Sequence, residues 1–229
     1  MIFLDSMISM VEKMEVFKII FFHELKILFK SRGRAIANIL YFVIFLALFQ
    51  ILTQNFEKNL QSQLFVIGTI IAILTSIITI NNDFLEKDFR DGSLEQIIIH
   101  CSNLEIFVIA KCLASWLSSS FLIALLATII LKISAFEILN FWQFFLVLIL
   151  NSLSLSFLLA FCGSLSMLGG FTSMISIIAI PLALPILIIT SATINENYEL
   201  NIKILFALTI LIIAVSSFAC AKIIKIANN

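Results

Sequence analysis

The side chains that could do chemistry gather in residues 83–95, which read DFLEKDFRDGSLE. Seven of these thirteen residues are charged, whereas only 12% of the whole chain is. Acidic and basic groups in one short run suit ion pairs and charge-assisted hydrogen bonds with another protein. The candidate contact residues for such a partner are Glu86, Asp88, Arg90, Asp91, Gly92, Ser93, Glu95 and Gln96.

The glycine in this segment predicts a sharp bend between two helices. Residues 83–91 keep a helical rhythm, and Gly92 then accepts the left-handed backbone angles of a helix C-terminus. Ser93 and Gln96 fit the capping box S-x-x-E/Q, and Glu95 lies in the first turn of the helix that follows, where the helix dipole favours negative charge. We expect a stiff projection with a second short helix over about 94–100. A solvated loop is the alternative.

Catalytic and metal-binding chemistry is not predicted within this chain. Its only histidines, His23 and His100, cannot supply a Ser–His pair or a metal-ligand set, and we interpret both as surface or structural residues. The two histidines also give no reason to predict a bound cofactor. No G-x-x-x-x-G-K-[ST] loop occurs, so the sequence gives no reason to predict that this chain binds ATP through such a loop.

The four cysteines occur singly and form no C-x-x-C pair, which argues against a disulfide framework and a zinc site. They are Cys101, Cys112, Cys162 and Cys220. We interpret them as small apolar packing residues.

Long stretches without charge must position the charged segment. A membrane span needs about 20 mostly apolar residues, and the charge-free stretches of this chain have room for six. We predict an all-α integral membrane protein with helices near 36–52, 64–81, 107–131, 142–162, 171–193 and 203–222. The first apolar run lies well inside the chain without a cleavage site after it, so we do not expect a removable signal peptide.

Lysine and arginine predict the orientation of these helices. With the N-terminus inside, 11 of the 14 basic residues lie on the cytoplasmic side, and Lys58, Lys132 and Lys203 lie outside. This bias predicts that both termini are cytoplasmic. The formal net charge of +0 gives no reason to expect nucleic acid as a partner.

Residues 14–32 predict an amphipathic helix on the membrane surface, in contact with lipid headgroups. Its charged side holds Glu15, Lys18, His23, Lys26 and Lys30, and its apolar side holds Phe17, Ile20, Phe21, Leu25 and Leu28. Glu24 points into the apolar side, where an unpaired carboxylate is costly. Either the helix is rotated or the acid protonated, or Glu24 pairs with a basic residue such as Lys111.

Two prolines lie one helical turn apart in the fifth predicted span, at Pro181 and Pro185. Each removes a backbone donor and bends the helix. A hinge in a moving helix and a static kink are both open interpretations.

Four stretches together resemble a known family. They are EKDFRDGSLEQI (86–97), AKCLASW (110–116), SIIAIPLALPILI (176–188), and ELKILFKS (24–31) with IAN (36–38). With an N-terminal interfacial helix and six spans, they are similar to type-2 ABC exporter permeases, and within these to the haem exporter protein B (CcmB) family of cytochrome c maturation. The chain differs from the family pattern at Ile39, where a proline is common.

The resemblance implies a division into residues 1–34, an N-terminal extension with the interfacial helix, and 35–229, a six-helix permease domain. It implies a non-catalytic permease of the bacterial inner membrane, with haem as a possible transported substrate. It also implies a separate CcmA-like ATPase that docks on the charged segment as a coupling helix, CcmC- and CcmD-like partners, and two copies per complex. Translation could begin at Met1 or at Met14.

Two other functions remain open from the sequence. One is a permease of the same superfamily that exports another amphiphile, such as a lipid, polysaccharide or drug. The other is a membrane scaffold or channel without ATP coupling.

Overall fold

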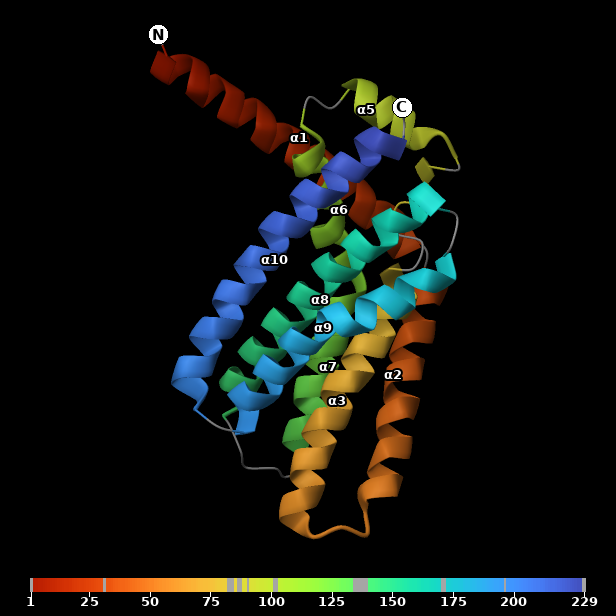
Figure 1. The fold of residues 1–229 in the computed structure, drawn as a ribbon, viewed down its shortest axis with the longest axis vertical. Coiled ribbons are helices and arrows are strands. Elements are labelled where there is room, and N and C mark those ends of the chain that lie inside the picture. The colour runs from red at the N-terminus through yellow and green to blue at the C-terminus, as the bar shows by residue number, and fades with distance from the viewer. Residues whose placement is uncertain are drawn as a thin grey trace.

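The protein is a bundle of long helices in its computed structural model, which describes residues 2–30, 32–81, 85, 88–89, 91–100, 103–133, 140–169, 172–195 and 197–227 (Figure 1). The helices are α1 (Ile2–Lys30), α2 (Arg32–Thr53), α3 (Lys58–Asn81), α5 (Ser93–His100), α6 (Leu104–Ser115), the π-helix η1 (Trp116–Ser120), α7 (Phe121–Ile133), α8 (Phe141–Gly169), α9 (Thr172–Asn195) and α10 (Tyr198–Ala227). No strand occurs among these residues, which confirms the all-α prediction.

Among the described residues, six helical stretches are long and apolar enough to cross a membrane, which agrees with the predicted number. They are Ile36–Thr53, Leu60–Thr79, Leu104–Lys132, Phe141–Leu165, Ile177–Ile194 and Tyr198–Ala227. Each overlaps one predicted span, because the length of an apolar run is a local property that the sequence contains directly.

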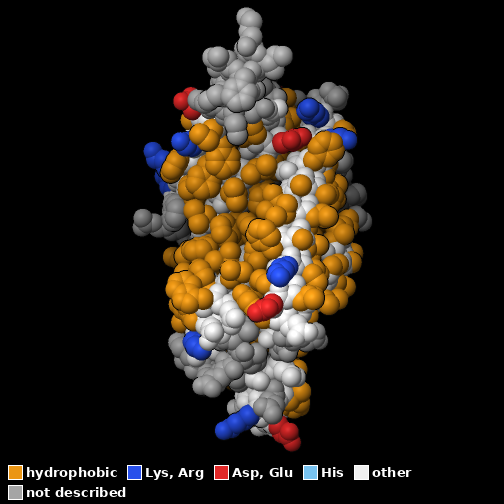
Figure 2. All heavy atoms as spheres, turned by 90° about the vertical axis from the view of Figure 1, so that its left-hand side faces the viewer, with side chains coloured by type: hydrophobic (Ala, Val, Ile, Leu, Met, Phe, Trp, Pro, Cys, Tyr) orange, Lys and Arg blue, Asp and Glu red, His pale blue; other side chains and the backbone are white. Residues whose placement is uncertain are grey.

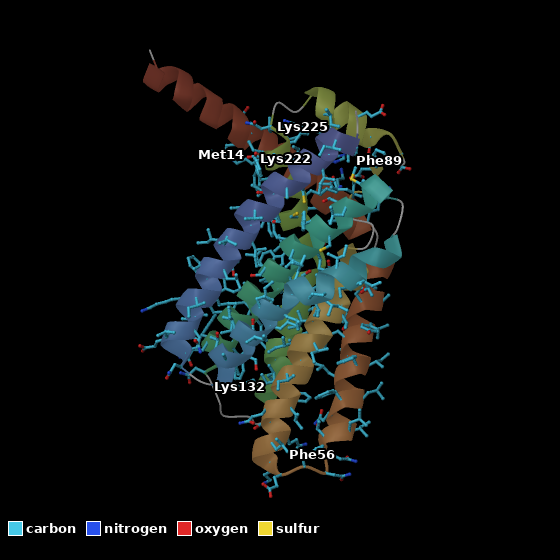
Figure 3. All side chains as sticks on the ribbon, in the orientation of Figure 1. Met14, Phe56, Phe89, Lys132, Lys222 and Lys225 are labelled. Atoms are coloured by element: carbon cyan, nitrogen blue, oxygen red, sulfur yellow. The ribbon has the colours of Figure 1, made fainter. Side chains whose placement is uncertain are left out.

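The two ends of the bundle carry most of the charged side chains on the face that Figure 2 shows. The α1 helix and the C-terminal end of α10 lie at the same end of the molecule as α5 (Figure 1). Lys222 and Lys225 lie at that end, whereas Lys132 and Phe56 lie at the opposite end (Figure 3). Hydrophobic side chains cover most of the middle of the face in Figure 2, and most of its charged side chains lie toward the two ends. This is the surface expected of a protein whose middle is in contact with lipid.

The α8 helix is the central element of the bundle and packs against α3, α7, α9 and α10. Its Leu148, Leu155 and Leu159 belong to the main hydrophobic core and are buried. A helix that is apolar on all sides is typically buried, and α8 fits that pattern.

The third span is one helix interrupted by a π-helical turn. The α6 helix runs into η1, which runs into α7 without a loop. Within the turn, the hydroxyl groups of Ser118 and Ser119 both donate to the Ser115 carbonyl oxygen, at 2.9 and 3.0 Å. Single π-helical turns interrupt α-helices at the cost of a regular hydrogen-bond ladder. The sequence prediction of an uninterrupted helix over 107–131 did not contain this turn.

The α1 helix differs from its prediction in length and in what its apolar side contacts. It spans Ile2–Lys30, whereas the sequence predicts a helix over 14–32, and α2 already begins at Arg32. Its apolar side packs along α6, and Ile20 contacts the second hydrophobic cluster, formed with residues such as Phe107 and Cys220. Because α6 is apolar at this contact, the apolar side of α1 is covered by another helix of the protein.

The α2 helix joins the bundle mainly through α3, and a glycine makes this contact close. A Cβ atom at Gly68 would lie 2.4 Å from Cδ1 of the Phe49 ring and 2.5 Å from Cε1. Small residues at helix contacts let two helices approach each other in membranes. At the α5 end of the same pair, the Thr79 hydroxyl donates to Asn38 Oδ1 at 3.2 Å.

We predict that Gly68→Ala loosens the α2–α3 pair, because the added methyl group overlaps the Phe49 ring. Such overpacking costs roughly 1–3 kcal/mol. The midpoint of thermal unfolding in detergent should fall, and Phe49→Leu in the same chain should restore most of it. Gly33→Ala is the matched control, since nothing lies within 4 Å of a Cβ atom there. Equal midpoints for wild type and Gly68→Ala would contradict the close contact.

Candidate functional site

The charged segment predicted from the sequence lies in the connection between α3 and α6. The structure describes Leu85, Asp88, Phe89 and residues 91–100 of this connection. Glu86 and Arg90 lie outside the described residues, as does the side chain of Gln96. We refer to Leu85, Asp88, Phe89 and Asp91–Glu95 as the 85–95 segment.

Two leucines attach the 85–95 segment to the helix bundle. Leu85 and Leu94 are 0% and 1% exposed and belong to the second hydrophobic cluster, with residues of α6, α8 and α10. Ile97 and Ile98 of α5 pack against the same cluster. Burying a leucine side chain contributes about 1.5–3 kcal/mol, so these contacts hold the segment against the bundle.

The backbone of the segment turns at Gly92, as the sequence predicts. Gly92 has φ of 70°, and its N–H donates to the Phe89 carbonyl oxygen at 3.3 Å. The Ser93 hydroxyl donates to the Asp88 carbonyl oxygen at 3.2 Å, which ties the start of α5 back to the preceding turn. Because α5 begins at Ser93, it starts one residue earlier than expected. The predicted return bond from Gln96 falls on a side chain outside the described residues.

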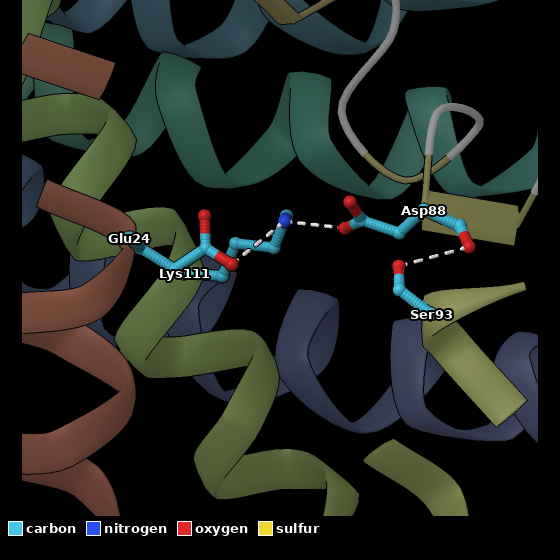
Figure 4. Close-up of polar contacts among 4 residues, drawn as sticks. All are labelled: Glu24, Asp88, Ser93 and Lys111. Atoms are coloured by element: carbon cyan, nitrogen blue, oxygen red, sulfur yellow. Dashed lines mark hydrogen bonds and ion pairs between the residues drawn. The ribbon is translucent and has the colours of Figure 1, made fainter. Parts of the chain in front are cut away.

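Behind the turn, three charged side chains from three parts of the chain meet at one point (Figure 4). Lys111 Nζ of α6 lies 3.1 Å from Glu24 Oε1 of α1 and 2.5 Å from Asp88 Oδ2 of the 85–95 segment. The side chains of Lys111, Glu24 and Asp88 are 10%, 14% and 24% exposed. We refer to these three residues as the ion cluster. The structure therefore pairs Glu24 with Lys111, the partner that the sequence suggested, and adds Asp88, which the sequence did not link to either residue.

The position of Lys111 in the third span explains why it needs these partners. It lies seven residues after Leu104, or about 10 Å along the helix. An ammonium group at such a place is costly unless carboxylates neutralise it. The Phe107 ring, whose centre is 5.8 Å from Nζ, adds a cation–π contact. The cluster therefore joins α1, α6 and the 85–95 segment through one side chain.

The outer side of the segment carries its exposed side chains. Asp91 and Glu95 are exposed, and the Phe89 side chain is 38% exposed. The described residues of the segment are thus divided into an inner side, with Leu85, Asp88 and Leu94, and an exposed outer side, with Phe89, Asp91 and Glu95.

Other candidate residues lie apart from the ion cluster. Pro181 and Pro185 lie within α9 on its exposed side, and the helix runs through both. His23 is exposed on α1, and the His100 side chain lies outside the described residues. In the part of the chain that the structure describes, no three His, Cys, Asp or Glu residues could hold a metal ion.

The cysteine interpretation is confirmed for the three cysteines that are described. Cys112, Cys162 and Cys220 are buried and free. Each lies in a hydrophobic cluster. Cys101 lies outside the described residues.

Sequence reasoning missed a row of polar contacts that joins α8 to its neighbours. The hydrogen bonds run from Trp116 Nε1 to Ser152 Oγ at 3.1 Å, from Thr190 Oγ1 to Asn151 Oδ1 at 3.1 Å, and between Ser154 Oγ and Thr209 Oγ1 at 2.8 Å. Polar side chains join helices inside membranes in this way. The signal was present as NSLSLS (151–156) within an apolar run.

We predict that Lys111→Met destabilises the protein by about 3 kcal/mol or more, because it leaves Glu24 and Asp88 without their ammonium group. The midpoint of thermal unfolding in detergent should fall by roughly 6 °C. The triple variant Glu24→Gln/Asp88→Asn/Lys111→Met removes all three charges and should recover most of that loss.

Lys225→Met is the control for losing a lysine at the same end of the molecule, since Lys225 is exposed. It should leave the midpoint unchanged. If Lys111→Met behaved like Lys225→Met, the ion cluster would not hold the segment.

The sequence is similar to one family of known proteins. The family described as "CcmB protein" matches residues 14–227. The chain is 28% identical over 211 residues to "Heme exporter protein B" of Haemophilus influenzae, an alignment that covers 89% of this chain and 94% of the relative. It is 26% identical over 219 residues to "Heme exporter protein B" of Pseudomonas aeruginosa, which covers 92% and 97%.

Proposed function

Because the chain belongs to the CcmB family, we propose that it is the membrane-spanning permease subunit of an ABC transport system that exports haem, or releases a haem-carrying chaperone, during c-type cytochrome biogenesis. Two relatives along nearly its whole length carry the name heme exporter protein B. Haem is then the transported substrate and not a resident cofactor, and the chain itself is not an enzyme.

The observation that carries the coupling part of this proposal is the rigid outer side of the 85–95 segment. The chain has no phosphate-binding loop of its own, so the free energy of ATP has to enter through a contact with another subunit. The 85–95 segment is held from behind by buried leucines and by the ion cluster, while Asp91 and Glu95 remain exposed. We propose that it is the coupling helix region on which a CcmA-like ATPase docks.

The ion cluster gives this contact a route to the membrane helices. Asp88 lies in the docking segment and Lys111 lies in the third span, so a displacement of the segment pulls on α6. Glu24 connects the same lysine to α1. We propose that Glu24 and Lys111 couple these parts mechanically, and that Pro181 and Pro185 allow α9 to bend as the bundle moves.

The orientation and the surroundings of the chain belong to the same proposal. The end with α5, Lys222 and Lys225 faces the cytoplasm, as the lysine distribution favours, in the inner membrane of a bacterial-type cell (Figure 3). The exposed Ile19 and Phe22 of α1, 70% and 66% exposed, would contact lipid at the membrane surface. Residues 1–34 then form the interfacial unit and residues 35–229 the permease domain.

The assembly would contain further subunits. CcmC- and CcmD-like membrane proteins would complete it, and two copies of this chain would offer two docking sites to two ATPase domains. Co-purification in mild detergent, with identification of the bound ATPase and measurement of bound haem, tests this composition. An ATPase without haem partners would favour export of another amphiphile, whereas ion conduction without any ATPase would favour a channel.

We predict that Asp91→Lys/Glu95→Lys abolishes stimulated ATP hydrolysis in the reconstituted complex, because both reversals place positive charge on the docking surface. The variant should still insert, since neither side chain is buried. The measurement is the ATPase rate per complex in nanodiscs at fixed amounts of both subunits.

Glu57→Lys is the matched control, since it reverses an exposed acidic residue in the α2–α3 connection. It should leave the rate unchanged. Full ATP hydrolysis by the Asp91→Lys/Glu95→Lys variant would exclude this segment as the docking site.

A further inference from the structure

One exposed aromatic side chain in the 85–95 segment lies outside every membrane span. Phe89 is 38% exposed and falls between the end of α3 at Asn81 and the start of α6 at Leu104. It lies at the end of the molecule that carries Lys222 and Lys225, away from Phe56 and Lys132 (Figure 3). The exposed Phe206 and Phe218 belong to a span helix, where lipid covers them, but that explanation does not extend to Phe89.

Within the 85–95 segment, two leucine side chains are buried but the Phe89 ring is exposed. Leu85 and Leu94, on either side of Phe89 in the sequence, are almost fully buried in the second hydrophobic cluster. Phe89 is instead exposed, as are Asp91 and Glu95 of the same segment. The described surface of the segment therefore presents one phenyl ring and two acidic groups.

The backbone holds this ring in place before any partner arrives. The Phe89 N–H donates to the Leu85 carbonyl oxygen at 3.0 Å, and the Phe89 carbonyl oxygen accepts from Gly92 N–H at 3.3 Å. The neighbouring Asp88 is bound through its carboxylate to Lys111 and through its carbonyl oxygen to Ser93. A side chain on a fixed backbone loses little conformational entropy on binding, which favours affinity.

The charges around the ring indicate what kind of surface it fits. Asp88 pairs with Lys111 behind the turn, and the exposed acidic side chains among the described residues of the segment are Asp91 and Glu95. A partner surface complementary to this arrangement has an apolar pocket for one ring and Lys or Arg side chains at its rim. Aromatic anchors in such pockets contribute most of the affinity in many interfaces.

We propose that Phe89 is the apolar anchor of the docking segment, and that it inserts into a pocket of the soluble ATPase subunit whose rim is basic. This inference rests on the proposed function and names the residue and the surface chemistry that make the contact. Asp91 and Glu95 contribute orientation and association rate, and Phe89 contributes affinity.

The test uses the full chain in nanodiscs of phosphatidylcholine and the purified ATPase subunit identified by co-purification. Phe89→Ala should weaken binding of that subunit by about tenfold or more, and Phe89→Leu should weaken it less, because leucine still fills an apolar pocket. Phe56→Ala is the matched control, since Phe56 is also exposed (50%) but lies at the other end of the molecule (Figure 3). It should bind like wild type.

Salt separates the two kinds of contact. Asp91→Asn/Glu95→Gln should bind more weakly at low ionic strength and show a flatter dependence on salt, because the screened interactions are gone. Phe89→Ala should keep the wild-type dependence on salt at its lower affinity. Loss of salt dependence in Phe89→Ala would mean that the ring acts only by positioning the acidic groups, and would overturn the anchor.

A tryptophan at the same position distinguishes a protein pocket from lipid. The emission of Phe89→Trp, corrected for Trp116 and Trp142 with the wild-type chain, should shift to shorter wavelength when the ATPase subunit is added. A shift already complete in empty nanodiscs and unchanged by the subunit would place the ring in the membrane and overturn the proposal.

The binding experiment separates this proposal from the proposed function. If wild type binds and Phe89→Ala binds equally well, the anchor fails while the proposed function stands. If no ATPase binds wild type, both fail.

Discussion

A lysine ammonium group inside an apolar helix bundle has to be neutralised, and the arrangement of the candidate site follows from how this chain does so. Lys111 lies along the third span, where water is scarce, and the two carboxylates that reach it come from α1 and from the 85–95 segment. Because neither carboxylate is close to Lys111 in sequence, satisfying one charge connects three separate parts of the chain. The turn at Gly92 and the packing of α1 along α6 are both consistent with the contact of Lys111 with Glu24 and Asp88.

The same contact divides the 85–95 segment into two sides with different roles. Leu85 and Leu94 are buried in the second hydrophobic cluster, and Asp88 pairs with Lys111. The inner side of the segment therefore contacts the helix bundle. Phe89, Asp91 and Glu95 remain on the outer side. This division fits the proposed function, in which a separate ATPase subunit docks on the outer side of the segment.

Within the bundle, hydrogen bonds between side chains join neighbouring helices. The third span contains a π-helical turn. The α8 helix uses Asn151, Ser152 and Ser154 to contact α9, η1 and α10. The η1 turn lies between Lys111 and the distant half of the same span, α7. In the proposed coupling, a displacement of the ion cluster would reach this irregular turn before the far end of the same span.

The sequence by itself determined the six spans and the turn at Gly92, because each depends on residues near one another in the chain: the length of an apolar run and the missing Cβ atom of glycine. The lysines that flank the spans predict which end faces the cytoplasm. The sequence also narrowed the site to one charged segment and raised Lys111 as a partner for Glu24. Only the tertiary structure decided that Asp88 completes the ion cluster, that the apolar side of α1 packs on α6, that Phe89 is exposed, and that Asn151, Ser152 and Ser154 of α8 bond to three neighbouring helices. These features depend on distances between residues far apart in the chain, and no local pattern contains such distances.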